Sequence, residues 1–366
     1  MSVQPTPLIP ITLITGFLGS GKTTLLNHLL VQPELNNALV IINEFGDISL
    51  DHHLVAHSSD NEVIQIGNGC LCCKVKGGLS KTLSDVYWRF SRNGQNLFDR
   101  VIIETTGLAD PAPILQMLMQ EPKMARYYKL DGVVTTVDLA TVHHSLDTHR
   151  EVIKQIAMAD CLLLTKGDLI DNPQHLDAIT ERLLSINPSA PRWTLLNGQL
   201  PAQHILNLGL FSAQRNLDVS KWLREAYFVP KSTVQTTRQT DLNLLSQHRC
   251  EHLSHATSSS PHKESIHSFC LFIENPIEAD VFTNWMGLLA GLVSPKVLRI
   301  KAIVHLKDSQ HPWVMHGVQH IISPLVALPK WPSTDTRSRI VFITDNLSQE
   351  WVNQTLEWLV NPPQEN

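Results

Sequence analysis

The feature that most restricts the possible folds of this chain is a glycine-rich segment close to the N-terminus. Gly16-Phe-Leu-Gly-Ser-Gly21-Lys22-Thr23 fits the pattern G-x-x-x-x-G-K-[ST], follows an apolar run and precedes a helical pattern. In this context the glycines let backbone N–H groups turn toward phosphates, and the N-terminus of the next helix adds partial positive charge. The segment therefore predicts a phosphate-binding loop between a buried strand and a helix.

The side chains of this loop have separate expected tasks. Lys22 should reach the terminal phosphates, and the Thr23 hydroxyl should ligate Mg²⁺. We expect both to act in catalysis as well. The residues of the loop expected to bind the nucleotide are Gly16, Gly19, Ser20, Gly21, Lys22, Thr23 and Thr24.

The first two hundred residues alternate short apolar runs with helical patterns. Candidate strands cover 11–15, 39–43, 62–66, 100–104, 132–138, 160–165 and 193–196, and candidate helices cover 22–31, 78–91, 111–120, 150–159 and 173–186. Strands joined by helical crossovers imply an α/β fold, a mostly parallel sheet with helices on both faces. Ligands of such sheets lie beyond the carboxyl ends of the strands.

The composition changes after this region. Between about 232 and 266, Gln, Thr and Ser dominate and the apolar periodicity lapses. We therefore predict a P-loop domain over 1–228, a histidine-rich flexible linker over 229–266, and a smaller C-terminal α+β domain over 267–366. Its expected strands are 267–274, 297–306, 313–322 and 339–344, and its expected helices are 279–292 and 348–359.

A second motif indicates which nucleotide is bound. Thr165-Lys166-Gly167-Asp168 follows the apolar run 161–164. The Asp168 carboxylate could accept both N1–H and N2–H of guanine, a pairing that adenine does not offer. The stem of Lys166 could cover the base, although Thr165 stands where asparagine is usual. This motif favours GTP over ATP.

A third motif, Glu104-Thr105-Thr106-Gly107, ends the predicted strand 100–104. P-loop enzymes place an acidic residue near Mg²⁺ here, together with a glycine that senses the γ-phosphate. The next residue is Leu108, where a water-orienting glutamine would stand in other GTPases. We therefore expect slow unaided hydrolysis, with Glu44 or Asp47 as the nearest candidates for positioning the water.

The cysteines are concentrated in one segment. Three of the six are Cys70, Cys72 and Cys73, a C-x-C-C pattern that is unlike the scattered cysteines of a core. Three thiolates suit zinc or another soft ion and leave one tetrahedral position open for transfer. A redox pair is the alternative. The linker histidines His248, His252, His255 and His262 are candidates for an accessory metal site.

Composition excludes several classes of partner. The chain has 366 residues and a net charge of −5, from 29 Lys plus Arg against 34 Asp plus Glu. An acidic chain is a poor match for a nucleic-acid backbone. No apolar run is long enough to cross a membrane. The first basic residue is Lys22, so the N-terminus lacks the charged lead-in of a signal peptide, and we expect a cytoplasmic protein.

Together these segments resemble the CobW-type GTPases, the zinc-regulated GTPase metalloprotein activators, which are relatives of the nickel-handling HypB and UreG proteins. The C-terminal Leu298-Arg299-Ile300-Lys301 followed by Gly317-Val318-Gln319 is similar to that family's second domain. The motifs that carry the rest of the resemblance are residues 15–24, 43–47, 69–73, 104–111 and 165–168. The resemblance implies GTP hydrolysis coupled to delivery of a metal, usually Zn²⁺, into client metalloproteins.

The chain departs from the family pattern at three positions. Ile42 stands where some members carry a glutamate, Asp47 replaces a common Glu, and Ala302 replaces a common Gly. The resemblance implies that the first departure removes a residue proposed as an accessory metal ligand in those members. The second keeps the charge but shortens its reach.

Our hypothesis is that Mg·GTP orders the loops around 44–47 and 104–107, which brings the three thiols into a metal-binding geometry. Hydrolysis then releases the ion to a client. The alternatives are a GTP-dependent metal sensor or store, a Co²⁺ chaperone for cobalamin or nitrile hydratase assembly, and an ATP-dependent enzyme. We expect the client, or a second copy in a homodimer, to dock on the C-terminal domain near Trp313 and Trp331.

Overall fold

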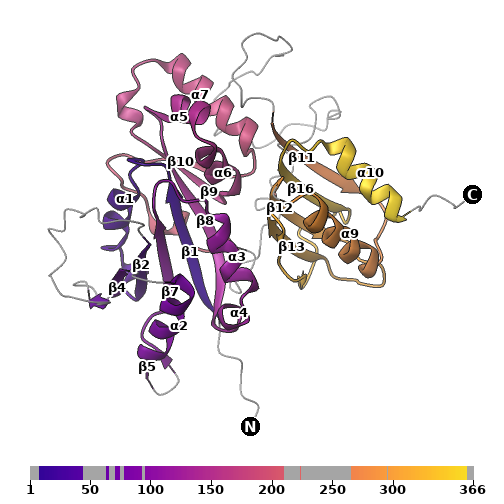
Figure 1. Ribbon diagram of the computed structural model, residues 1–366, viewed down its shortest axis with the longest axis horizontal. Helices are drawn as coiled ribbons and strands as arrows, with labels where there is room; N and C mark the ends of the chain where they lie inside the picture. Colours follow the sequence, from indigo (N-terminus) through magenta and orange to yellow (C-terminus); the bar gives the residue numbers. More distant parts are fainter. Residues whose placement is uncertain are drawn as a thin grey trace, which may run out of the picture.

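The computed structural model describes residues 8–43, 63–65, 71–74, 78–92, 95–209, 223, 265–294 and 296–360. Two sheets organise these residues, and helices pack on both (Figure 1). One sheet is built from the N-terminal half of the chain and the other from residues after 265.

The N-terminal sheet runs in the order β10-β9-β8-β1-β7-β2-β4-β3. Neighbouring strands are parallel except β3, which is antiparallel to β4. The strands are β1 (Ile9–Gly16), β2 (Ala38–Asn43), β3 (Val63–Gln65), β4 (Leu71–Lys74), β7 (Arg100–Thr105), β8 (Tyr128–Asp138), β9 (Cys161–Thr165) and β10 (Arg192–Thr194). The predicted α/β fold with a mostly parallel sheet is confirmed.

Each face of this sheet is covered by its own apolar cluster. The helices are α1 (Lys22–Leu29), α2 (Leu79–Arg89), α3 (Ala112–Gln120), α4 (Pro122–Tyr127), α5 (Val142–Thr148), α6 (Arg150–Met158) and α7 (Pro173–Ile186). Leucines of α1 cover one face, together with apolar residues between 195 and 206. Helices α2, α3, α5, α6 and α7 cover the other face. The strands are therefore buried on both sides, which explains their continuous apolar runs.

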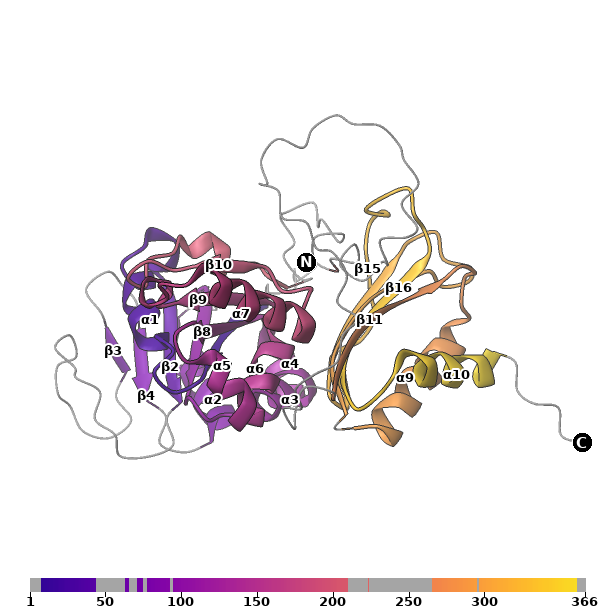
Figure 2. The same ribbon diagram turned by 90° about the horizontal axis from the view of Figure 1, so that it is seen from above.

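The C-terminal sheet is antiparallel, in the order β11-β16-β12-β13-β14 with β15 paired to β13. Figure 2 shows this sheet from the side, with α9 and α10 on one of its faces. Its elements are β11 (Ile266–Ile273), α9 (Ala279–Leu292), β12 (Val297–Val304), β13 (Trp313–Val318), β14 (Ile321–Ile322), β15 (Val326–Ala327), β16 (Ser338–Asp345) and α10 (Gln349–Val360). Side chains alternate along the strands, so that one face packs on α9 and α10. This is the predicted α+β arrangement.

Two expectations for this half of the chain were wrong. The segment 313–322 is not one strand but a hairpin, because Gln319 adopts a left-handed φ of 53° and turns the chain between β13 and β14. Trp313 and Trp331 are not exposed docking residues either. Trp313 donates its ring N–H to Ser309 at 2.9 Å, and Trp331 packs edge-on against His305, so both are half-buried in their own domain.

The two halves share one apolar core. Leu298, Val318 and Ile343 of the C-terminal sheet belong to the same buried cluster as the helices on the N-terminal sheet. Strand β12 packs against α6, and β11 packs against α7. Among the described residues, no helix has both the length and the apolarity needed to cross a bilayer.

Candidate nucleotide and metal site

The glycine-rich loop connects β1 to α1, as the sequence predicts. Gly16 has a φ of 142°, and a Cβ there would lie 2.3 Å from the Thr136 hydroxyl oxygen of β8. Gly21 is the N-cap of α1 with a left-handed φ of 89°. Both positions require glycine, because a side chain would strain the backbone or collide with its neighbour.

Side chains of the loop contact its own backbone and the neighbouring strand. The Lys22 ammonium donates to the carbonyl oxygens of Gly16 at 2.8 Å and Phe17 at 3.0 Å, so it lies directly over the loop. Ser20 shares a 2.7 Å hydrogen bond with the hydroxyl of Thr136. Thr24 is exposed on the first turn of α1. The loop is thus tied to the neighbouring strand β8 as well as to its own helix.

The end of β7 meets this loop. The Thr23 hydroxyl donates to a carboxylate oxygen of Glu104 at 2.9 Å, although the two residues are 81 positions apart. Glu104 is buried, with 5% of its surface exposed. A hydroxyl and a carboxylate at hydrogen-bond distance are oxygen donors of the kind that Mg²⁺ prefers, so the two residues fit that ion.

Gly107 lies against the phosphate loop. A Cβ at Gly107 would come within 2.6 Å of the backbone nitrogen of Leu18, so no side chain fits between the two segments. The preceding residue pair is also fixed, because Thr105 donates to the Thr15 hydroxyl at 2.9 Å. Two motifs that are ninety residues apart in the sequence therefore form one surface.

The guanine-type motif lies at the end of β9, on the other side of the loop. The Thr165 hydroxyl donates to the Ser20 carbonyl at 3.0 Å, which joins the motif to the phosphate loop. Lys166 has a left-handed φ of 56° and forms an ion pair with Asp138 at 2.7 Å. Asp168 is exposed. Thr165 therefore contacts the phosphate loop from the position where asparagine is usual.

Several predicted residues lie outside the described residues. These are Glu44, Asp47, Cys70, His248, His252, His255 and His262. Cys72 and Cys73 are described only through their backbone, as part of β4, where they are in register with Val40 and Ile41 of β2. Within the described part of the chain, no group of three or more His, Cys, Asp or Glu side chains could hold a metal ion.

Sequence reasoning missed three polar residues near the loops. Asp138, the partner of Lys166, ends the apolar strand β8, and a carboxylate at a strand end is a signal that could have been used. Lys154 and Gln155 on α6 contact the segment after β7. Their sequence neighbourhood gives no sign of this, because the contact joins residues more than forty positions apart.

Comparison with known proteins agrees with this geometry. The model of the CobW/HypB/UreG nucleotide-binding domain matches residues 10–194, and the model of the cobalamin synthesis protein CobW C-terminal domain matches residues 266–360. The first match alone spans just over half of the chain. The chain belongs to the CobW/HypB/UreG family. The resemblance inferred from the motifs is confirmed.

Individual members of this family align over nearly the whole chain. Zinc chaperone YjiA of Escherichia coli strain K12 is 29% identical over 342 residues, 93% of this chain and 96% of the relative. Zinc-regulated GTPase metalloprotein activator 1 of Schizosaccharomyces pombe is 29% identical over 354 residues, 93% of this chain and 83% of the relative. The crystal structure of Zn(II)-bound YjiA GTPase from E. coli matches with a TM-score of 0.68 at 26% identity, covering 97% and 99% of the two chains.

Proposed function

We propose that this protein is a GTP-hydrolysing metallochaperone that binds zinc at Cys70, Cys72 and Cys73 and transfers it to client metalloproteins. The observation that carries the proposal is the contact between Thr23 and Glu104, which joins the phosphate loop to the end of β7. Similarity over both domains to proteins named as zinc chaperones supports the choice of cargo.

The nucleotide in this proposal is GTP. Asp168 would accept the two N–H groups of the guanine edge, and the stem of Lys166 would cover the base. The ion pair between Lys166 and Asp138 and the bond between Thr165 and Ser20 support this assignment, because they hold the motif beside the phosphate loop.

Thr23 and Glu104 would hold Mg²⁺. When bound, this ion supplies positive charge to the β- and γ-phosphate oxygens. Lys22 would neutralise charge on the same phosphates. The side chain of Leu108 is 53% exposed and apolar, so it cannot orient a water molecule. We assign that task to Glu44 or Asp47 and expect slow hydrolysis when no metal or client is bound.

The strand register supports a link between nucleotide and thiols. Ile42 of β2 is the neighbour of Lys74 at the end of β4 and also of Glu104 on β7. The backbone of the cysteine segment therefore ends level with Glu104, two strand spacings away, or about 10 Å. GTP-dependent order in the loops beyond these strands would reach both sites. The accessory role of the linker histidines stays part of the proposal, as does a reducing, cytoplasmic location.

Zinc titrations test this function. We expect a GTP analogue to tighten zinc binding by about tenfold relative to GDP, and zinc to tighten analogue binding by the same factor, because linkage is reciprocal. The Cys70/Cys72/Cys73→Ser variant should lose the tight site, whereas Cys270→Ser, which changes a buried cysteine of the C-terminal domain, should keep it.

Equal zinc affinity with the analogue and with GDP would contradict the coupling. If zinc-loaded protein restored the activity of an apo-enzyme at the same rate with GTP and GDP, we would conclude that the protein is a metal sensor or store and not a delivery protein. Parallel titrations with Co²⁺ identify the preferred ion.

A further inference from the structure

Helix α6 contacts the segment that follows β7. Gln155 is buried, with 1% of its surface exposed, and its side-chain amide donates to the carbonyl oxygens of Gly107 at 3.1 Å and Ala109 at 3.0 Å. The neighbouring residue on the same helix makes a second contact, since Lys154 forms a 2.6 Å ion pair with Asp110. The whole segment from Gly107 to Asp110 is therefore attached to α6.

The nitrogen and the oxygen of the Gln155 side-chain amide differ in their hydrogen bonding. Its nitrogen makes both hydrogen bonds, whereas its oxygen has no hydrogen-bond partner in the described structure. An apolar side chain of similar length would fill the same space without leaving that oxygen unsatisfied. Packing alone therefore does not explain why a glutamine stands at this position. Hydrogen-bond donation to the carbonyls of Gly107 and Ala109 does explain it.

Fixing these carbonyls limits how the segment can move. A peptide group is planar, so holding the carbonyl oxygen of Gly107 also fixes the direction of the next N–H group. Gly107 is already in close contact with Leu18 of the phosphate loop. The contacts with Gln155 on one side and with Leu18 on the other therefore fix the distance between this segment and the phosphate loop.

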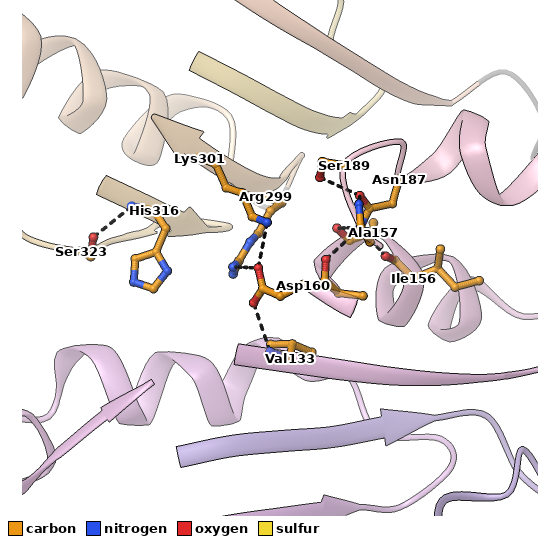
Figure 3. Close-up of polar contacts among 12 residues, drawn as sticks. Val133, Ile156, Ala157, Asp160, Asn187, Ser189, Arg299, Lys301, His316 and Ser323 are labelled. Atoms are coloured by element: carbon orange, nitrogen blue, oxygen red, sulfur yellow. Dashed lines mark hydrogen bonds and ion pairs between the residues drawn. The ribbon is translucent and has the colours of Figure 1, made fainter. Parts of the chain in front are cut away.

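Helix α6 is in turn held by the C-terminal domain at both ends. Its first residue, Arg150, forms a 2.5 Å ion pair with Asp345 of β16. Just beyond its last residue, Asp160 accepts from Arg299 at 2.6 Å and lies 3.0 Å from Lys301, both on β12 (Figure 3). These three side chains are buried. The helix that holds the Gly107 segment is thus anchored to the second domain.

We propose that Gln155 is a positioning residue that sets the Gly107–Ala109 segment for contact with the γ-phosphate, and that α6 links this segment to the C-terminal domain. The inference rests on the proposed function, in which Gly107 senses that phosphate. A nucleotide-dependent shift of the segment would displace α6 through these contacts. Because β12 of the second domain contacts α6, the displacement would reach that domain.

The test is the affinity ratio between guanylyl imidodiphosphate and GDP. Gln155→Met keeps the length of the side chain but cannot donate. We expect it to weaken binding of the analogue about tenfold, because two donated hydrogen bonds are lost, and to change GDP binding less than twofold. Gln116→Met on α3 is the control, because Gln116 is paired with Gln120 and not with the segment.

Equal losses for both nucleotides, or none, would overturn the inference, because a purely structural role does not alter the ratio. Lys154→Met removes a side chain that is more exposed than that of Gln155 and so tests the same link at a smaller cost to folding. We expect a two- to threefold change in the same direction, and an unchanged ratio in Lys154→Met counts against the link. If the wild-type protein itself binds neither nucleotide, the proposed function fails instead.

Discussion

Single side chains fix the relative position of the motifs around the phosphate loop. Thr165 is the clearest case, since its hydroxyl bonds to the Ser20 carbonyl and also to the carbonyl of Val137 at 3.2 Å. Its methyl group lies against Gly21, where an added Cβ would be 3.5 Å away. A β-branched residue with one hydroxyl therefore satisfies both the polar and the steric requirements of this position.

Thr165→Val keeps the shape and removes the hydroxyl. The single hydroxyl proton, which lies between the Ser20 and Val137 carbonyls, is then lost as a donor, which costs about 1–2 kcal/mol in the free energy of unfolding. Because the guanine motif loses its connection to the phosphate loop, GTP-analogue and GDP affinities should both fall about fivefold. Isothermal titration measures this. Unchanged affinities for both nucleotides would show that the connection has no functional role, and Thr194→Val on the exposed part of β10 is the control.

At the scale of elements, helix ends depend on polar residues that lie elsewhere in the sequence. Asn187 donates its side-chain amide to the carbonyls of Ile156, Ala157 and Ala159, at 2.8, 3.2 and 3.0 Å (Figure 3). Ile156 and Ala157 lie in the last turn of α6, and Ala159 is the residue that follows the helix. Carbonyls at a helix end lack i+4 donors, and of these three Ile156 also accepts from the N–H of Ala159 at 3.2 Å. The amide oxygen of Asn187 accepts from Ala190.

Asn187→Ala should therefore lower the free energy of unfolding by about 3 kcal/mol, because several buried groups lose their partners together. Asn172→Ala removes the side-chain cap of α7, which is exposed and has one hydrogen bond, and should cost about 1 kcal/mol. Urea unfolding of the two variants compares them. A loss at Asn187 no larger than that at Asn172 would contradict the role assigned to this residue.

Most elements could be predicted from the sequence because they carry local signals. Helix α7 was predicted to the residue, since Asn172 and Pro173 start it and Asn187-Pro188 ends it. Strand β4 was missed, because its state depends on pairing with β2 rather than on its own cysteine-rich sequence. The same holds within the candidate site. The loops were predicted by their motifs, whereas Gln155 and Asp138 are recognised only through contacts in the folded chain.

At the scale of the whole molecule, charged side chains are buried where the two domains meet. Burial would raise the pKa of Asp160, but Arg299 and Lys301 lower it to about 2. Burial and the same cations lower the pKa of His316 to about 3. This cluster joins residues that are 139 positions apart, so no sequence pattern could predict the contact.

These shifts predict a pH dependence of stability. Because the His316 pKa is lower in the folded state, protons bind the unfolded chain first as the pH falls below about 6.5. The contribution of neutral His316 to the free energy of unfolding is complete above that pH. Below it, this contribution falls by about 1.4 kcal/mol per pH unit toward pH 3. The lowered Asp160 pKa adds a loss only below about pH 4.

His316→Gln should therefore flatten the unfolding free energy between pH 6.5 and 5.0, over which the wild-type protein loses about 2 kcal/mol through this residue. His320→Gln, an exposed histidine of the same hairpin, should keep the wild-type slope. Denaturant unfolding at three pH values makes the comparison. Parallel slopes in His316→Gln and wild type would rule out a buried neutral imidazole.

The C-terminal sheet is enclosed on both sides. One face packs on α9 and α10, and the other contributes Leu298, Val318 and Ile343 to the core under the first domain. On that second face, Ile303, Val314 and Val341 are also buried, in a cluster with Leu223 and Leu328. Within the described part of the chain, a protein that approaches the outer side of this half therefore meets helices α9 and α10 before it reaches the sheet. Leu292 and Trp358, which are 68% and 61% exposed on that outer layer, are apolar side chains that such a visitor would touch.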